Sequence, residues 1–228
     1  MSESPEYGLT VSVFVADSTR MGCELMTTAL RRSRSNLKVA GYATDAAGTR
    51  AWLHENDADV AVISAELKEG GTAGFDVTRE IRASHPKTSV VMMLDSIERV
   101  MVLEAFRAGT SGIFSRDEEF DLLCKCIRVV YEGQIWAGNK ELRFLLDAVV
   151  ERQPIGANSV KKPKLLTTRE EGVVQLVAEG FTNRDISRQL NLSEHTVRNY
   201  LFRIFNKVGT SNRLELALYA AKREESKN

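Results

Sequence analysis

Five short apolar runs recur through the first 145 residues of the chain, and each is followed by an amphipathic stretch. The runs, which predict buried strands, lie at 11–16, 37–42, 60–63, 90–94 and 113–115. Solid apolar runs that alternate with helices are typical of a parallel sheet covered on both faces. Five such units predict a five-stranded, doubly wound α/β fold, whose functional pocket lies at the carboxyl ends of the strands.

The amphipathic stretches predict the helices of this first domain. They lie at 21–32, 44–55, 74–83, 100–108 and 119–131, and a further helix is expected at 140–152. The segment 153–164 has two prolines, one glycine and three lysines, which is typical of a linker. The 228 residues therefore divide into a first domain over 9–136, a linker helix and linker over 137–164, and a second domain over 165–224.

The second domain is predicted to be all helical, with four helices at about 169–179, 183–190, 194–208 and 212–221. Thr168 with Glu171, and Thr182 with Asp185, fit the capping box, in which two side chains at a helix start bind each other's backbone amides. The turn over 191–193 joins a short helix to a longer one. This arrangement is typical of a helix-turn-helix.

The longer helix has two distinct faces. Its apolar stripe consists of Val197, Leu201, Ile204, Phe205 and Val208, and the opposite stripe of His195, Arg198, Asn199, Phe202 and Asn206. Arginine can bind guanine through two hydrogen bonds and asparagine can bind adenine in the same way, so Arg198 and Asn199 are the predicted base readers. On spacing alone, the alternative is an ordinary helical bundle whose polar face is only solvated.

Other polar residues of this unit suit the phosphates of DNA. The full set predicted to contact DNA is Asn183, Arg184, Ser193, His195, Thr196, Arg198, Asn199, Phe202, Arg203 and Lys207. The charge distribution agrees, because residues 1–152 hold 18 basic and 23 acidic side chains whereas residues 153–228 hold 13 and 8. Only the C-terminal part is therefore expected to bind a polyanion.

The segment LTTREEGVVQLVAEGFTNRDISRQLNLSEHTVRNYLFRIFNKVGTSNRLELALYA closely resembles the LuxR-type (GerE-type) helix-turn-helix. Two positions depart from that family: Ser187 replaces the usual alanine, and Phe202 replaces a residue that is often basic. Phe202 either contacts a thymine methyl group or packs at a protein interface. The resemblance implies a transcription regulator that binds double-stranded DNA, with RNA polymerase as a further candidate partner.

We expect a homodimer on a palindromic site, because two recognition helices related by a twofold axis gain affinity and length of site. The last helix offers Leu214, Leu216, Leu218 and Tyr219 for pairing, as in the family. The alternative is that these side chains all belong to the core.

The first domain resembles the receiver domain of two-component response regulators, in the NarL-type pairing with this output domain. The resemblance covers about 11–136 and is clearest in VLEAFRAGTSGIFSRDEEFDLL and YEGQIW. In such receivers a carboxylate accepts a phosphoryl group beside Mg²⁺, two acids hold the metal, and a hydroxyl and a lysine bind the phosphoryl oxygens.

Counting along this resemblance places other residues where that chemistry is needed. The acidic pair is replaced by Asp17 and Ser18, the nucleophile by Ser64, the hydroxyl by Leu94 and the lysine by Arg116. Loss of nucleophile, metal ligand and hydroxyl together predicts a pseudo-receiver that acts independently of phosphorylation. We expect Asp17 and Arg116 to form an ion pair that replaces the lost metal and lysine contacts.

Two alternative functions are considered for this domain. It could be a binding module for a small ligand or partner protein that controls access to DNA, with Arg116 as the anion contact. An enzyme with Ser64 as nucleophile is disfavoured, because neither a G-x-S-x-G motif nor a plausible base is present. The nearby acids Glu66 and Asp95 are either substitutes for the lost acids or solvated loop residues.

The sequence also restricts where the protein is found in the cell and which cofactors it can bind. No apolar run approaches the roughly 18 residues of a membrane span, and the start MSESPEYG lacks the basic and apolar parts of a secretory signal. We therefore expect a cytoplasmic protein. Cys23, Cys124 and Cys126 are not at zinc-ligand spacing, which predicts free thiols, no metal and no other cofactor.

Overall fold

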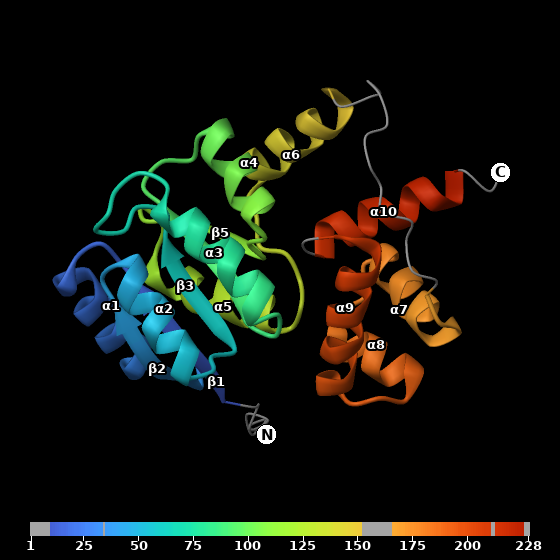
Figure 1. Cartoon of the computed structure of the whole chain (residues 1–228), viewed down its shortest axis with the longest axis horizontal. Coiled ribbons are helices and arrows are strands. Elements are labelled where there is room, and N and C mark those ends of the chain that lie inside the picture. The colour runs from blue at the N-terminus through green and yellow to red at the C-terminus, as the bar shows by residue number, and fades with distance from the viewer. Residues whose placement is uncertain (1–9, 34, 152–165, 211–212, 226–228) are drawn as a thin grey trace, which may run out of the picture.

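A computed structural model describes residues 10–33, 35–151, 166–210 and 213–225, which form two lobes (Figure 1). The first lobe contains one five-stranded parallel sheet with the order β2-β1-β3-β4-β5. Its strands are β1 (Val11–Ala16), β2 (Leu37–Ala43), β3 (Val60–Ser64), β4 (Ser89–Leu94) and β5 (Gly112–Ser115). The predicted doubly wound sheet is therefore confirmed.

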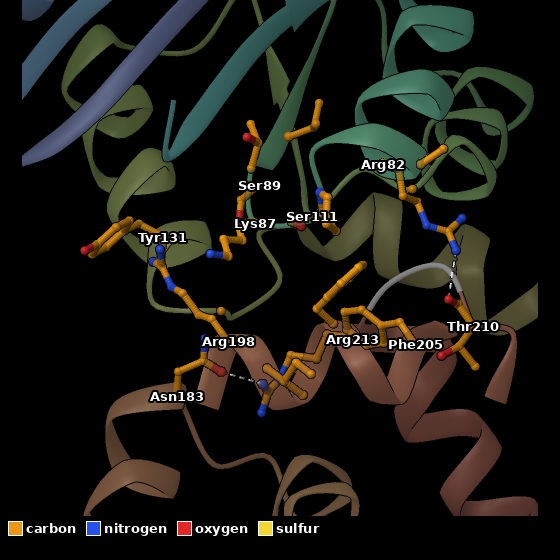
Figure 2. Close-up of a pocket in the computed structure, with 18 of the residues that line it drawn as sticks. Arg82, Lys87, Ser89, Ser111, Tyr131, Asn183, Arg198, Phe205, Thr210 and Arg213 are labelled. Carbon is orange, nitrogen blue, oxygen red and sulfur yellow. Dashed lines mark hydrogen bonds between the residues drawn. The ribbon is translucent and has the colours of Figure 1, made fainter. Parts of the chain in front are cut away.

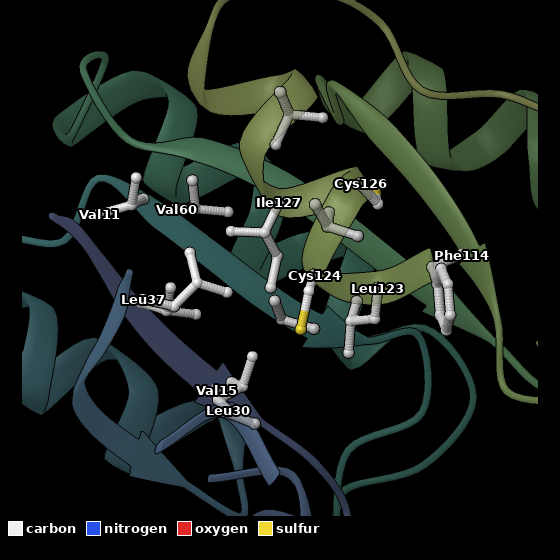
Figure 3. Packing of buried hydrophobic residues seen from close by; sticks show 14 of the residues in the cluster. Val11, Val15, Leu30, Leu37, Val60, Phe114, Leu123, Cys124, Cys126 and Ile127 are labelled. Carbon is white, nitrogen blue, oxygen red and sulfur yellow. The ribbon is translucent and has the colours of Figure 1, made fainter. Parts of the chain in front are cut away.

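Five helices cover the two faces of this sheet. They are α1 (Arg20–Arg32), α2 (Ala46–Glu55), α3 (Ala73–Ser84), α4 (Arg99–Ala108) and α5 (Phe120–Tyr131). Apolar side chains of α1 and α5 pack on one face, where Leu30, Cys124 and Ile127 meet the valines of β1 and β3 (Figure 3). Side chains of α2, α3 and α4 pack on the other face. The sheet is buried on both sides, which is why its strands read as solid apolar runs.

The helix after the sheet, α6 (Asn139–Glu151), lies beside α4 (Figure 1). Phe144 and Leu145 of α6 pack against the apolar cluster beneath α4. The predicted linker over 153–164 lies outside the described residues. Within the described ranges, no helix combines the length and the apolar character that are needed to cross a membrane.

The second lobe consists of α7 (Thr168–Ala178), α8 (Asn183–Leu190), α9 (Glu194–Val208) and α10 (Arg213–Glu225). Its core is built from residues of all four helices, among them Val173, Ile186, Ile204 and Leu216. The four predicted helices are confirmed, although α10 extends four residues past the predicted end, and the predicted start at 212 lies outside the described residues.

The predicted capping box at the start of this lobe is off by one residue. Thr167, not Thr168, caps α7: its hydroxyl oxygen accepts from the amide of Glu170, whose carboxylate accepts from the amide of Thr167 at 2.8 Å. The sequence Thr-Thr-Arg-Glu-Glu fits the motif in two registers. The observed register places Glu170 in the interior, where it also meets Lys207.

Candidate DNA interface and receiver pocket

The turn between α8 and α9 fixes the helix-turn-helix geometry. Asn191 ends α8 in the left-handed conformation, at φ 52°, which asparagine tolerates better than most residues. Ser193 then begins α9 by accepting a hydrogen bond from the amide of Thr196 at 3.0 Å. The hydroxyl groups of Ser193 and Thr196 also bond to each other at 2.7 Å. Both residues lie at the N-terminus of α9, where the helix dipole favours an anion.

The two predicted faces of α9 differ in burial as expected, with one exception. Val197, Leu201 and Ile204 are buried, and Phe205 and Val208 are half-buried. On the polar side His195 and Arg203 are exposed, whereas Thr196, Asn199 and Phe202 are half-buried. The side chain of Asn206 lies outside what the structure describes.

Arg198 is the exception, because it packs against the first lobe. Its guanidinium lies 3.9 Å from the ring centroid of Tyr131, donates to the main-chain oxygen of Tyr131 and comes within 3.7 Å of a carboxylate oxygen of Asp59. Only 18% of the Arg198 side chain is exposed. The expectation of a solvent-exposed base reader is therefore wrong for this arrangement of the two lobes. Burial raises the pKa of Tyr131, against the opposing effect of the Arg198 charge.

Asn183, at the start of α8, is also buried between the lobes. Its backbone amide donates to the main-chain oxygen of Glu132 at 3.2 Å, and its side-chain oxygen accepts from Arg213 at 3.3 Å. The neighbouring Gly133 has φ 82°, and a Cβ atom there would lie 2.2 Å from the side-chain amide nitrogen of Asn183. A glycine is thus needed both for the backbone conformation and for the close approach.

Lys207 forms an ion pair within the second lobe. Its ammonium group lies 2.6 Å from Glu170, whose side chain is 4% exposed. Burial alone would raise the pKa of Glu170, but the hydrogen bonds from Lys207 and Thr167 hold that pKa below its ordinary value. Lys207 therefore already has a carboxylate partner, which the sequence pattern did not reveal.

The predicted dimerisation residues on α10 separate into two groups. Leu216 is fully buried in the core of the lobe, so it is not a surface residue. Tyr219 packs against the same core. Leu214 and Leu218 are half-buried and lie outside that core cluster, so they remain the residues of this set that could pair.

A second polar site lies where β1, β3 and β4 of the first lobe end. Arg116, just after β5, donates to the carboxylate of Asp17 at 2.5 Å and to the hydroxyl oxygen of Ser64 at 2.8 Å. The same guanidinium forms an ion pair with Asp95 at 2.5 Å. Asp17 is 2% exposed and also accepts two hydrogen bonds from Thr19, both at 3.0 Å. The predicted Asp17–Arg116 pair is therefore present, and the guanidinium fills the site between the acids.

Two predictions for this pocket need correction or refinement. Leu94 is fully buried in the apolar cluster under α4 and does not line the pocket, because the last residue of β4 points into the core. The next residue, Asp95, lines the pocket instead, together with Ser18 and Glu66. Asp95 is exposed, as expected for a solvated loop residue, and it also pairs with Arg116.

Comparison with known proteins identifies the families of both domains. Residues 13–128 match the family described as the response regulator receiver domain, and residues 164–220 match bacterial regulatory proteins of the luxR family. Similar curated proteins include the transcriptional regulatory protein LnrK of Bacillus subtilis (strain 168), 24% identical over 85% of this chain and 89% of that protein. The response regulator UvrY of Escherichia coli (strain K12) is 26% identical over 85% of this chain and 87% of its own.

Among solved structures, RcsB in a complex with DNA superposes with a TM-score of 0.54 at 20% identity, covering 93% of this chain and 98% of the other. A LuxR-family response regulator from Aurantimonas sp. SI85-9A1 gives a TM-score of 0.56 at 21% identity, over 62% of this chain and 99% of its own. At these identities, the likeness concerns the fold.

Proposed function

Because this chain belongs to the response regulators that join a receiver domain to a luxR-family DNA-binding domain, we propose that it is a sequence-specific transcription regulator whose receiver acts without phosphorylation. The observation that carries the proposal is the position of Arg116. Its guanidinium bonds to Asp17, Ser64 and Asp95, which surround the place where a receiver would hold a metal ion and a phosphoryl group.

This arrangement opposes phosphoryl transfer in two ways. Ser64 ends β3 and carries no carboxylate, and among the described residues no histidine lines the pocket to activate its hydroxyl. Arg116 also offsets part of the negative charge of Asp17 and Asp95, which would otherwise attract Mg²⁺. Its guanidinium already bonds to the side chains that surround the place of a metal ion and a phosphoryl group. We assign no catalytic role to any of these residues.

The DNA-binding proposal centres on the exposed end of α9. Arg198 and Asn199 are the proposed base readers, whereas Ser193, Thr196 and Arg203 are proposed to contact phosphates. Since Arg198 bonds to the first lobe in the described arrangement, it can reach a base only after α9 separates from Tyr131. The affinity for a specific site is therefore lowered by the free energy that is needed to separate Arg198 from Tyr131.

We further propose that the protein binds a palindromic site as a homodimer. Leu214 and Leu218 of α10 leave apolar surface outside the core of their lobe. One similar structure contains two RcsB dimers bound to two parallel DNAs, which supports the proposal by analogy. A footprint that covers two symmetric half-sites is expected, and a footprint on a single half-site from a monomer would contradict it.

Selection from random DNA with the full chain should yield one preferred site. Asn199→Ala is expected to weaken binding to that site by about 1–3 kcal/mol and to relax the base preference. Arg198→Ala is also expected to relax the base preference, with a smaller loss of affinity because it removes the contact with Tyr131 as well. Arg203→Ala is the matched control, since this exposed residue should weaken all sequences alike and reduce the salt slope. If Arg198→Ala and Asn199→Ala left specific binding unchanged, the proposed reading face would be wrong.

A further inference from the structure

A cavity of about 510 Å³ lies between the two lobes, and its lining is unusually one-sided in charge (Figure 2). Six basic side chains line it: Arg79, Arg82, Lys87, Arg107, Arg198 and Arg213. Among the residues that the structure describes, no aspartate or glutamate belongs to the lining. Cavities between domains are common ligand sites, and this volume lies in the range of small-molecule sites.

Three of the six cations are paired with acids outside the cavity. Arg79 forms ion pairs with Asp76 and Glu104, Arg107 lies 3.9 Å from Glu104, and Arg198 lies 3.7 Å from Asp59. These three residues contribute positive potential, but their charge is partly compensated. The remaining cations are Arg82, Lys87 and Arg213.

Arg82 and Arg213 bind neutral main-chain or amide oxygens. Arg82 donates to the carbonyl of Thr210 at 2.8 Å, and Arg213 donates to the carbonyl of Phe181 and the side chain of Asn183. Burial lowers the pKa of Arg82, against the opposing charge of Glu215, and lowers the pKa of Arg213 to about 10. Arg82 therefore has an acid nearby, whereas no ion pair is found for Arg213 within the described chain.

One further cation faces the same space. Lys87 is exposed and lines the cavity, and within the described chain no hydrogen bond or ion pair is found for its ammonium group. A cation without a protein partner in a cavity wall is available to an anionic ligand.

The remaining lining is apolar and aromatic. Phe202 and Phe205 of α9 and Tyr131 at the end of α5 contribute rings, and Leu201 adds an aliphatic surface. Charged side chains bind phosphate through charge-assisted hydrogen bonds, and aromatic rings bind flat organic groups. We propose that the cavity binds a small organic phosphate, with its phosphate beside Lys87 and its organic part against the rings of Phe202 and Phe205.

This ligand site is separate from the receiver pocket. The cavity includes Ser89, the first residue of β4, and Ser111, just before β5, so it lies at the amino edge of the sheet. Asp17, Ser64 and Arg116 lie at the opposite, carboxyl edge. A ligand in the cavity contacts both lobes and would stabilise the arrangement that covers Arg198. If the proposed DNA-binding function holds, the ligand therefore weakens DNA binding.

Calorimetry on the full chain at constant ionic strength tests the site without DNA. The probes are adenosine 5′-monophosphate, glucose 6-phosphate, inorganic phosphate and adenosine. We expect at least one organic phosphate to bind with a micromolar Kd, and both inorganic phosphate and adenosine to bind at least tenfold more weakly. Binding of neither organic phosphate at millimolar concentration would overturn the proposal, as would equal binding of inorganic phosphate.

The matched variants are Lys87→Ser and Lys68→Ser, since both lysines are exposed and only the first lines the cavity. Lys87→Ser should weaken binding of the organic phosphate by about tenfold, the loss of one charge-assisted contact, whereas Lys68→Ser should leave it unchanged. Equal binding by wild type and Lys87→Ser would place the ligand elsewhere and reject the site. Because this readout contains no DNA, it decides the ligand site even if the proposed DNA-binding function fails.

Discussion

The two polar sites at opposite edges of the sheet solve the problem of buried charge in different ways. At the carboxyl edge, Arg116 has three oxygen-bearing partners in Asp17, Ser64 and Asp95. At the amino edge, Arg82 and Arg213 are half-buried against main-chain oxygens in a cavity whose described lining contains no carboxylate. The first site thus contains its own counter-charges, whereas the lining of the second contains only cations among its charged side chains.

The largest expected effect is the loss of stability when Arg116 is removed from the site at the carboxyl edge. Arg116→Ala leaves Asp17, which is 2% exposed, with a negative charge and only the Thr19 hydrogen bonds. We expect the free energy of unfolding to fall by about 3 kcal/mol, as for a buried pair that loses one partner. Urea denaturation followed by tryptophan fluorescence reports this directly, because Trp52 and Trp136 both lie in the first lobe.

Arg107→Ala is the control for that measurement. Arg107 is 53% exposed and lies 3.9 Å from its acid, so its removal should change the free energy of unfolding by less than about 1 kcal/mol. Similar small losses for Arg116→Ala and Arg107→Ala would show that the carboxyl edge does not depend on the internal cation, and the contrast between the two edges would disappear.

Separating the two lobes is expected to change the affinity for DNA, by a smaller free energy than the loss of stability expected for Arg116→Ala. Gly133→Ala places a Cβ atom 2.2 Å from the side chain of Asn183, so this buried side chain must move and its contact with the first lobe is disturbed. We expect this variant to expose Arg198 and to lower the Kd for the preferred DNA site by about tenfold, equivalent to roughly 1.4 kcal/mol. Fluorescence anisotropy with labelled DNA measures the change.

Gly70→Ala separates that effect from backbone strain. Gly70 also has positive φ, at 93°, but a Cβ atom there would meet nothing within 4 Å. Both variants carry a similar conformational cost in the first lobe, and only Gly133→Ala disturbs the contact with α8. Equal DNA affinities for the two variants would mean that the contact does not restrain α9.

The sequence was sufficient for the fold and insufficient for the contacts between its lobes. The strands were predictable because burial on both faces makes them continuously apolar, and the helix ends were predictable from Thr182, Ser193 and Gly209. The Asp17–Arg116 pair was predictable because both residues follow neighbouring parts of the same sheet edge.

Other features depend on tertiary geometry that no local pattern encodes. Arg198 reads as an exposed base contact from helical spacing, but Tyr131 and Asp59, 67 and 139 positions away, cover it. Asp59 in turn is held by the amide and hydroxyl of Ser12. The cavity likewise combines basic residues from α3, α9 and α10, so its charge could not be recognised before these elements were placed in space.

The Glu170–Lys207 pair extends the comparison to the second lobe, where an internal cation again compensates a buried acid. The folded-state pKa of Glu170 is below its ordinary value of 4.5. Its contribution to stability is therefore fully present above about pH 4.5 and is lost as the pH falls through the lower, folded-state pKa. Glu170→Gln should destabilise α7 by about 1 kcal/mol at pH 7, in the range of a capping side chain, and by much less near pH 3.

Amide hydrogen exchange in α7 measures this local stability at the two pH values. Glu171→Gln is the matched control, since Glu171 is about half exposed and pairs only with Arg223 at the surface. Its effect should be smaller and nearly independent of pH. If the loss in Glu170→Gln were the same at pH 7 and pH 3, the carboxylate charge would not be what stabilises the helix start.

The smallest expected effect is none at all, and it is the sharpest test of the contrast between the two edges. Mg²⁺ with acetyl phosphate or beryllofluoride should leave the Kd for DNA unchanged, because Ser64 has no carboxylate and Arg116 already holds Asp17 and Asp95. A ligand shifts a conformational equilibrium only if it binds the two states with different affinity, and a site without the required groups has no such preference. Mass spectrometry on the treated full chain provides the independent readout. An acid-labile phosphoryl group on Glu66 or Asp95, accompanied by tighter DNA binding, would show that the carboxyl edge still receives a phosphoryl signal despite its internal cation.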